Sequence, residues 1–572
     1  MKKQEILIAW ATLFICLALF FQTYNKFHFF AVENSQLFLN SRDFIISGVS
    51  SVGGGASLLS GWIVQFFVLP YAGAILTALL LTLTGLVIFR LLNRMTRPGY
   101  LSFVLSIIPI LFSGYLHFNA NYFYQGTVSF LLVLLLLVAT IRIKRKNLRA
   151  VFGTVLPVAL YLFAGPYAIL HAGIFAIIEY FRKELKPYIY ILPLVATLLV
   201  AFLSVKAGWV GEYRFAFLPD MYYHALLKPG ILLYFPGALV IISIVLAGML
   251  STTEGKKRKK QQTIGWIFAC VTVICLAYYG TAQENDRKNY RIKTFAHYAR
   301  TGRWEKITAA CKGIELRNYV EICYLNMALA NEGKLAENLF DYDQHGAQGL
   351  VVSWNKSPDI SSLLSAVYMT CGHIALAQEM AFEANIASTG NGSPEMYKRL
   401  IATNRIFKND KVAEKYARLL KQTTFHADDA DRLQRTTGGC LPDTLMLSLS
   451  NGMQDDLEII ATACPEYRKN ALEYCGALYL LSHDLENFKH FLEKYAGTEM
   501  LPALPRSFQE AVLILSEKEP GIVNRYPLAE ETVNRFKAFR QTVLANRNNS
   551  SRLPALLKSS FGNTYWYYFM FN

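Results

Sequence analysis

Long apolar runs separated by short basic clusters dominate the first half of the chain. Crossing the hydrocarbon core of a bilayer takes about 20 mostly apolar residues in a helix. Nine runs approach this length, at residues 6–21, 70–89, 100–117, 127–141, 150–165, 167–181, 187–205, 230–250 and 263–280. The pattern predicts an all-α chain whose residues 1–280 form a polytopic transmembrane bundle of about nine spans.

The basic clusters between these runs predict the orientation of the chain in the membrane. With nine spans and the N-terminus inside, 18 clustered Lys and Arg residues fall on the cytoplasmic side and only five on the other. Cytoplasmic loops of membrane proteins carry such an excess of Lys and Arg. The sequence therefore predicts a multi-pass protein of a bacterial inner membrane, in contact with the lipid bilayer, with residues 281–572 in the periplasm.

The same charge pattern decides two ambiguous stretches. Residues 150–181 have basic clusters at both ends, which predicts two short spans broken at Gly165-Pro166 rather than one long span. An extra crossing at Leu58–Leu69 would put every later cluster outside. That run is therefore expected to be a membrane-surface helix behind Gly53-Gly54-Gly55, within a long first external loop, residues 22–69.

The second half of the chain shows paired helical patterns joined by a recurring turn. A Gly or a polar residue precedes the second helix of each pair, and successive turns are 31, 39, 37 and 74 residues apart, at Gly302, Gly333, Gly372, Asn409 and His483. A period of about 34 residues with helix–turn–helix units indicates a tetratricopeptide-like α-solenoid. We expect such repeats in residues 281–424, and further helical repeats with an aromatic tail in residues 425–572. The tail should pack on the solenoid or at the membrane interface.

Charge and cysteine content narrow the classes of function. The net charge of +16 comes almost entirely from residues 1–280, which hold 23 Lys and Arg against 8 Asp and Glu. The soluble half is nearly neutral, so a nucleic-acid partner is not expected. Its six cysteines form no CxxC pair, which argues against zinc or thioredoxin-like chemistry. Disulfides stay open if this half is periplasmic.

The first external loop holds the main candidates for catalysis. Glu33, Gln36, Arg42 and Asp43 follow the first span, and Glu33 and Gln36 recur at helical spacing with Leu37 and Asn40. A carboxylate on that face could act as the base that activates an acceptor hydroxyl. The alternative is that Glu33 is a surface charge and that Arg42 and Asp43 form a solvated pair.

Further candidates for substrate binding lie in the second external loop and in the sixth span. The loop at 206–229 combines aromatic and charged side chains that suit a sugar or a lipid phosphate, or else an interfacial belt: Arg214, Asp220, Tyr222, Tyr223 and His224. Within the span, His171 is a candidate, whereas Glu179 is expected to reach the cytoplasmic surface beside Arg182. We predict no metal site and no cofactor, although a divalent metal that Asp220 and His224 share with Glu33 or Asp43 stays open.

Several strings resemble one uncharacterised family of polytopic Bacteroidota membrane proteins with a periplasmic repeat tail. They are Glu33-Asn-Ser-Gln-Leu-Phe-Leu39, Gln65-Phe-Phe-Val-Leu-Pro-Tyr-Ala-Gly-Ala74, Phe217-Leu-Pro-Asp-Met-Tyr-Tyr223, Tyr324-Leu-Asn-Met-Ala-Leu-Ala-Asn-Glu-Gly333 and Phe561-Gly-Asn-Thr-Tyr-Trp-Tyr-Tyr568. The resemblance covers essentially the whole chain. It is a domain of unknown function and implies no activity.

The architecture also resembles the C-type glycosyltransferases, although the loop lacks their paired acidic motif. That resemblance implies sugar transfer from a polyprenyl-phosphate donor at the outer face, with Glu33 or Asp43 as base and a lipid-linked substrate. A second interpretation is a non-catalytic scaffold whose solenoid recruits periplasmic protein partners. Whether the chain is an enzyme stays open between these two interpretations.

Overall fold

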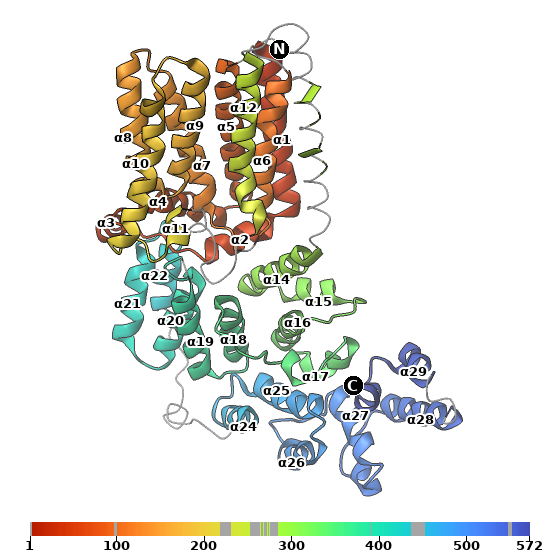
Figure 1. Ribbon diagram of the computed structural model, residues 1–572. Coiled ribbons are helices and arrows are strands. Elements are labelled where there is room, and N and C mark those ends of the chain that lie inside the picture. The colour runs from red at the N-terminus through yellow and green to blue at the C-terminus, as the bar shows by residue number, and fades with distance from the viewer. Residues whose placement is uncertain are drawn as a thin grey trace. The chain divides into compact units, whose positions relative to one another are not determined.

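The computed structural model describes most of the chain as helices (Figure 1). The described residues are 3–95, 100–119, 121–217, 230–251, six positions between 263 and 274, 284–388, 390–435, 452–546 and 552–572. Within these ranges there are 28 α-helices, and the pairing of Ala496 with Leu501 is an isolated β-bridge rather than a strand. The prediction of an all-α chain is confirmed.

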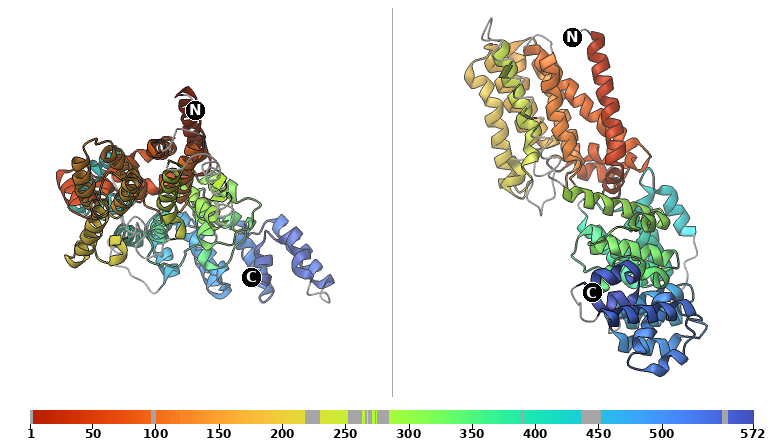
Figure 2. Two further views of the ribbon diagram at one scale, coloured as in Figure 1. Left: turned by 45° about the horizontal axis from the view of Figure 1, so that its top comes forward. Right: turned by 90° about the vertical axis from the view of Figure 1, so that its right-hand side faces the viewer.

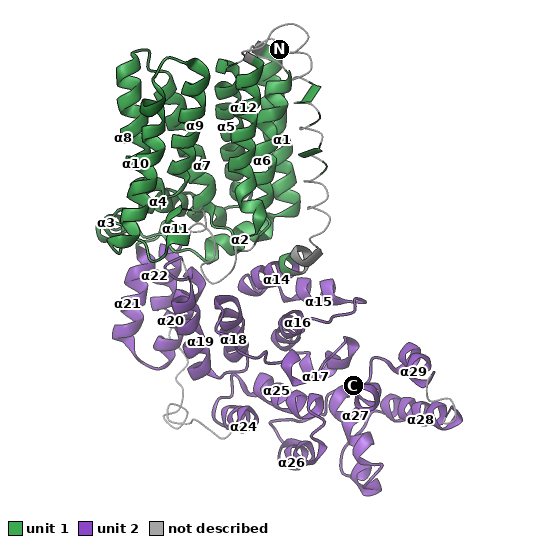
Figure 3. Cartoon of the chain, viewed as in Figure 1, with its two compact units in different colours: residues 1–290, 422–425 green, residues 291–421, 426–572 purple. Residues whose placement is uncertain are grey.

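The chain divides into two compact units, each with its own core (Figure 3). Unit 1 comprises Met1–Tyr290 together with Gln422–Phe425, and unit 2 comprises Arg291–Lys421 together with His426–Asn572.

Unit 1 is a bundle of long apolar helices that run side by side (Figures 1 and 2). Six helices are long and apolar enough to cross a membrane: α1 (Lys3–Tyr24), α5 (Ala72–Met95), α7 (Tyr124–Ile141), α8 (Lys146–Ala164), α10 (Pro187–Lys206) and α12 (Phe235–Ser251), the last extended by η3 (Ile231–Tyr234). Two shorter helices accompany them, α6 (Tyr100–Leu116) and α9 (Tyr167–Arg182). A multi-pass membrane protein is therefore indicated. The ninth predicted span, residues 263–280, falls mostly outside the described residues, and the count of nine stays a prediction.

A helix break separates α8 from α9 where the sequence predicted it. Gly165 lies in the left-handed region with a φ of 74°, and Pro166 follows at the N-cap of α9. Glycine adopts this conformation without the clash that a Cβ would cause, and proline is favoured at a helix start. Residues 150–181 thus form two helices rather than one.

Residues 26–68, between the first two long helices, are folded into short helices at one end of the bundle (Figure 1). They are α2 (Lys26–Asn34), α3 (Arg42–Val49), α4 (Gly54–Val64) and η1 (Gln65–Val68). Helix α4 begins at Gly54, four residues before the predicted start at Leu58. Its glycines serve close packing rather than flexibility, because a Cβ on Gly54 would lie 1.9 Å from the carbonyl oxygen of Gly48.

Unit 2 consists of short helices packed in succession along the chain, beginning with the part of the first of them from Arg291 onward. These are α14 (Glu284–Arg300), α15 (Trp304–Cys311), α16 (Tyr319–Asn331), α17 (Leu335–Asn338), η4 (Leu339–Asp341), η5 (Ala347–Gly349), α18 (Pro358–Thr370), α19 (Ile374–Ala387), α20 (Pro394–Ile406), α21 (Asp410–Lys421), α22 (Ala427–Arg435), α24 (Met453–Ala463), α25 (Arg468–Leu481), α26 (Leu485–Tyr495), α27 (Arg506–Leu515), η6 (Pro520–Asn524), α28 (Glu530–Ala545), α29 (Leu553–Phe561) and α30 (Tyr565–Phe571).

The recurring turn has one geometry at all five predicted places. The left-handed residue stands two positions before the second helix, at Gly302, Gly333, Gly372, Lys408 and His483. The N–H of the next residue donates to a carbonyl five positions earlier, at 2.8–2.9 Å in every case. This bonding closes a helix end and satisfies its last carbonyls. In the fourth turn the left-handed residue is Lys408, so the predicted position, Asn409, is one residue late.

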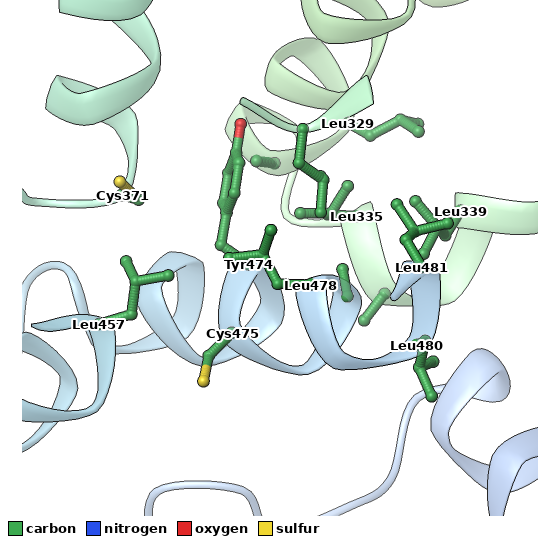
Figure 4. Packing of buried hydrophobic residues seen from close by; sticks show 14 of the residues in the cluster. Leu329, Leu335, Leu339, Cys371, Leu457, Tyr474, Cys475, Leu478, Leu480 and Leu481 are labelled. Atoms are coloured by element: carbon green, nitrogen blue, oxygen red, sulfur yellow. The ribbon is translucent and has the colours of Figure 1, made fainter. Parts of the chain in front are cut away.

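The core of unit 2 forms where α25 meets α16 and α17 (Figure 4). Tyr474 and Leu478 of α25 point toward Leu329 and Leu335, and all four side chains are buried. The aromatic tail joins this unit as well. Trp566 is fully buried and its indole N–H donates to the carbonyl of Glu510 on α27 at 2.9 Å. Of the two predicted places for the tail, the helical domain is therefore the one observed.

Candidate functional site

Glu33 lies on the short helix that follows the first span, and its side chain is buried. Asn25 precedes α2 and donates from its side-chain amide to the carbonyl of His117 at 2.9 Å, which ties the helix to the end of α6. Phe29 packs edge-on against Phe67 of η1. Glu33 follows Phe29 by four residues, on the same helical face, and is only 8% exposed. The interpretation of Glu33 as a solvated surface charge is therefore wrong.

The predicted helical face that Glu33 shares with Gln36, Leu37 and Asn40 is also wrong. Helix α2 ends at Asn34, and the chain is non-helical from there to Ser41. The Ser35 hydroxyl donates to the carbonyl of Val32 at 2.9 Å. Such local bonds of Ser and Asn compete with helix continuation. Gln36 stays near Glu33 through its backbone N–H, which donates to the Glu33 carbonyl at 3.1 Å.

Arg42 and Asp43 lie in the first turn of α3, and both are exposed to solvent. The hydroxyl of Ser41 accepts from the N–H of Phe44 and so caps the helix. Asp43 beside the N-terminus of this helix is stabilised by the helix dipole. This placement matches the solvated alternative for Arg42 and Asp43.

Of the five candidates in the loop at 206–229, only Arg214 lies in the described residues. Arg214 belongs to α11 (Tyr213–Phe217), where its guanidinium lies 4.6 Å from the centre of the Phe215 ring. The Tyr161 hydroxyl of α8 donates to the carbonyl of Ala216 at 3.0 Å and fixes α11 to the bundle. Figure 1 shows α11 at the same end of unit 1 as α2, α3 and α4. The remaining candidates lie outside the described residues: Asp220, Tyr222, Tyr223 and His224.

His171 lies in the second turn of α9 and is completely buried. Helix α9 packs against α7, α8, α10 and α12, so the imidazole is surrounded by the bundle. A group in this position has no face open to water. The role of His171 in substrate binding stays a prediction. The burial of its side chain does not favour that role.

A polar cluster that sequence reasoning did not assemble lies beside α2. The imidazole Nε2 of His117 and the Thr127 hydroxyl are 2.9 Å apart, and the Thr127 and Tyr122 hydroxyls are 3.2 Å apart. The Tyr124 hydroxyl is 3.2 Å from that of Thr77. All five side chains are buried. Because these groups satisfy one another, the cluster holds α5, α6 and α7 together. The signal in the sequence was the accumulation of His and Tyr at 115–124.

A second buried cluster lies at the opposite end of the bundle and corrects the prediction for Glu179. Its carboxylate does not reach the surface, since it is 0% exposed. It accepts a hydrogen bond from Nη2 of Arg149 at 3.2 Å and one from Arg182 at 3.0 Å, and Arg149 also contacts Glu184. The paired arginines neutralise the carboxylate, which is how a buried charge is tolerated. The cluster locks α8 to α9 and is structural.

Unit 2 contains an open cleft of about 380 Å³ lined by η5, α18, α19, α24 and α25. Its walls are mostly apolar, and its polar lining residues are Gln348, Tyr368 and Asp456. His373 lies beside it, with its imidazole Nε2 3.1 Å from one oxygen of the Asp456 carboxylate. The pair joins residues 83 positions apart, so no local sequence pattern indicated it.

Among the described residues, no group of three or more His, Cys, Asp or Glu side chains is arranged to hold a metal ion. The six described cysteines are free thiols: Cys16, Cys311, Cys323, Cys371, Cys464 and Cys475. Burial raises the pKa of Cys311, Cys323 and Cys371 to about 12. These thiols remain protonated at neutral pH and are poor nucleophiles.

Comparison with known proteins gives one match. A family model described as "Family of unknown function (DUF6057)" matches residues 2–572. No curated protein and no solved structure shows a significant match to the chain.

Proposed function

Because the chain belongs to this family of unknown function over nearly its whole length, we propose its activity from the outer end of the bundle. We infer that it is an inner-membrane glycosyltransferase or related group transferase, acting at the periplasmic face on a polyprenyl-phosphate sugar donor. The observation that carries the proposal is the buried carboxylate of Glu33, on the helix next after the first span.

Burial suits Glu33 to the role of a general base. Where water is excluded, electrostatic interactions are stronger, and a carboxylate can take the proton of an acceptor hydroxyl as its oxygen attacks the anomeric carbon. The phosphate then leaves with the bonding electrons. Asp43 is exposed to solvent, where water would compete with an acceptor hydroxyl, so we prefer Glu33 over Asp43 as the base.

The distribution of basic residues supports an outer-face site. The described clusters flank the helix ends opposite α2, α3 and α4, where Arg142 and Arg182 each lie close enough to Arg94 to repel it. If those ends are cytoplasmic, the end that carries Glu33 and Arg214 faces the periplasm. A guanidinium suits a phosphate group of such a donor, and Arg214 on α11 lies at this end of unit 1.

Complementation of a deletion strain tests the proposed base. Lipid-linked sugars and surface glycans are compared in strains carrying the native protein, Glu33→Gln or Asp43→Asn. Removal of a general base lowers such reactions by roughly 10²–10⁴-fold, so Glu33→Gln should leave the deletion phenotype. Asp43→Asn is the matched control and should restore the glycans. Full rescue by Glu33→Gln, at native protein levels, would exclude the proposed base.

A second function is favoured by the cleft of unit 2. Its open shape and apolar walls suit a non-catalytic scaffold that recruits a periplasmic protein through a tetratricopeptide-like solenoid. Tagged full-length protein, cross-linked in cells, should then retain one reproducible partner when Glu33 is replaced by Gln. If no protein is enriched over an untagged strain, the scaffold function is wrong.

A further inference from the structure

Helix α21 presents three basic side chains to solvent on one side. Lys411, Lys415 and Arg418 follow one another at intervals of four and three residues, and all three are exposed. Residues at these intervals are neighbours on a helix surface. The residues on the opposite side are buried: Ala413, Ala417 and Leu420. The helix therefore packs through its apolar side and turns the three cations, its basic face, outward.

The basic face is not neutralised by the acidic residues around it. The ion pairs of α21 lie at its ends, where Asp410 contacts Arg405 and Lys421 contacts Asp431. No side chain of the basic face forms an ion pair with an acidic residue in the described part of unit 2. Glu414 is exposed at the edge of this face and leaves three cations against one carboxylate. A group of like charges of this kind attracts a partner of the opposite sign.

The chain runs from the end of α21 directly into a segment that is anchored on unit 1. Gln422–Phe425 follows the helix and belongs to unit 1. The N–H of Asn40 donates to the carbonyl of Gln422 at 2.8 Å. The ring of Phe66 in η1 packs edge-on against that of Phe425, with ring centres 5.4 Å apart. These contacts tie the segment to the short helices at one end of the bundle.

The short helices that hold this segment have the character of a membrane-surface structure. Helix α3 begins two residues after Asn40 and exposes Ile45, Ile46 and Val49, and α4 exposes Trp62; these four side chains are 44–52% exposed. Exposed apolar residues on short helices at the end of membrane spans are typical of the lipid–water interface, where Trp is enriched. We therefore place the bilayer surface at the level of α3 and α4.

The length of α21 limits how far its cations are from that surface. The helix has 12 residues, so its axis is about 18 Å long. The potential of a charged surface acts over about 10 Å at physiological salt. Arg418, in the last turn, is within this range in any direction of the helix. The whole basic face is within range when the helix lies along the surface.

Charge and position together favour phospholipid headgroups as the partner. We propose that the basic face of α21 binds anionic headgroups of the bilayer that surrounds unit 1. The apolar side of the helix is used within unit 2, so Lys and Arg bind phosphate oxygens by charge and without insertion. An acidic protein has the same sign of charge, but the bilayer is held beside this face by the chain itself, at a high effective concentration. The inference does not depend on the transferase or the scaffold function.

Photo-crosslinking in nanodiscs tests the proposal on the full-length protein. Benzoylphenylalanine replaces Val412, whose side chain is 41% exposed at the edge of the basic face. The discs contain phosphatidylcholine and phosphatidylglycerol in equal parts, and mass spectrometry identifies the lipid adducts. Each Lys or Arg close to an anionic surface strengthens the attraction roughly fivefold, so phosphatidylglycerol adducts should exceed phosphatidylcholine adducts by at least this factor. The excess should fall at high salt. Equal yields of the two adducts would overturn the proposal.

Two sets of substitutions locate the effect. Replacing Lys411, Lys415 and Arg418 together by Gln should remove the preference for phosphatidylglycerol. The matched control replaces three exposed lysines outside α21 by Gln: Lys312, Lys356 and Lys537. The control should keep the preference, and melting temperatures establish that both proteins are folded. A preference that persists without the basic face would contradict the assignment. In cells, an adduct with an acidic protein in place of phospholipid would overturn it as well.

Discussion

At the scale of single residues, backbone conformation separates glycines that the fold requires from those it tolerates. Gly302 has a φ of 66°, and an added Cβ would meet no atom within 4 Å. Any effect of Gly302→Ala must therefore come from the left-handed backbone, which costs other residues about 1–2 kcal/mol. We expect the free energy of unfolding to fall by about 1 kcal/mol, measured by chemical denaturation.

Gly521 is the matched control for this substitution. It also has open space around it, but its φ is not positive. Gly521→Ala should leave the stability unchanged or raise it slightly, because alanine restricts the unfolded chain. Equal losses at the two positions would show that left-handed geometry is not what Gly302 provides.

Glu510 predicts a pH dependence of stability in unit 2. Desolvation raises the pKa of this buried carboxyl to about 7, against 4.5 for an ordinary glutamate, although the Tyr565 N–H lowers it in part. Between pH 4.5 and 7 the folded protein therefore binds more protons than the unfolded chain. Its stability falls as the pH rises through this window, by at most about 3 kcal/mol from this group.

Glu510→Gln should remove that slope, which unfolding measurements from pH 4.5 to 8 would show. In the native protein the Tyr565 N–H donates a hydrogen bond to the Glu510 carboxylate at 2.7 Å. The side-chain carbonyl oxygen of glutamine can accept the same hydrogen bond. Glu379→Gln, on an exposed part of α19, serves as the control and should retain the native slope. The same pH dependence in Glu510→Gln protein would assign it to another group.

At the scale of elements, the turn between α3 and α4 depends on close backbone approach. A Cβ at Gly54 would lie 1.9 Å from the Gly48 carbonyl oxygen and 2.6 Å from the Ser51 hydroxyl. Because a carbonyl cannot turn away without moving its helix, Gly54→Ala should displace α3 against α4. We expect a loss of about 1–3 kcal/mol, the usual range for overpacking, seen as a lower melting temperature in detergent.

Gly173 in α9 is the comparison for Gly54, because a Cβ there would meet nothing within 4 Å. Gly173→Ala should preserve the melting temperature or raise it, since alanine favours helix more than glycine does. A similar loss from both substitutions would indicate a general sensitivity of unit 1 to added volume.

At the scale of the whole molecule, the proposed orientation places unit 2 in the periplasm. The exposed side chains of Lys144 and Arg317 lie in the basic cluster after α7 and in unit 2, respectively. In spheroplasts, a membrane-impermeant maleimide should label Arg317→Cys and should not label Lys144→Cys until the membrane is broken. Labelling of Lys144→Cys alone would reverse the orientation and remove the basis for a periplasmic site.

The sequence by itself determined the features that follow from local pattern. Apolar runs of membrane length become helices because backbone groups in lipid must bond within their own segment. The break at Gly165-Pro166 and the turns at Gly302, Gly333 and Gly372 were readable because glycine and proline act on their own backbone.

Only the tertiary structure decided which polar groups are buried and with what. Glu33 and Asp43 are both acidic residues of the segment between α1 and α5, yet Glu33 is buried and Asp43 is solvated. Glu179 meets Arg149 across two helices, and His373 meets Asp456 from 83 positions away. Such partners are set by how helices pack, and the packing depends on side chains from the whole unit at once.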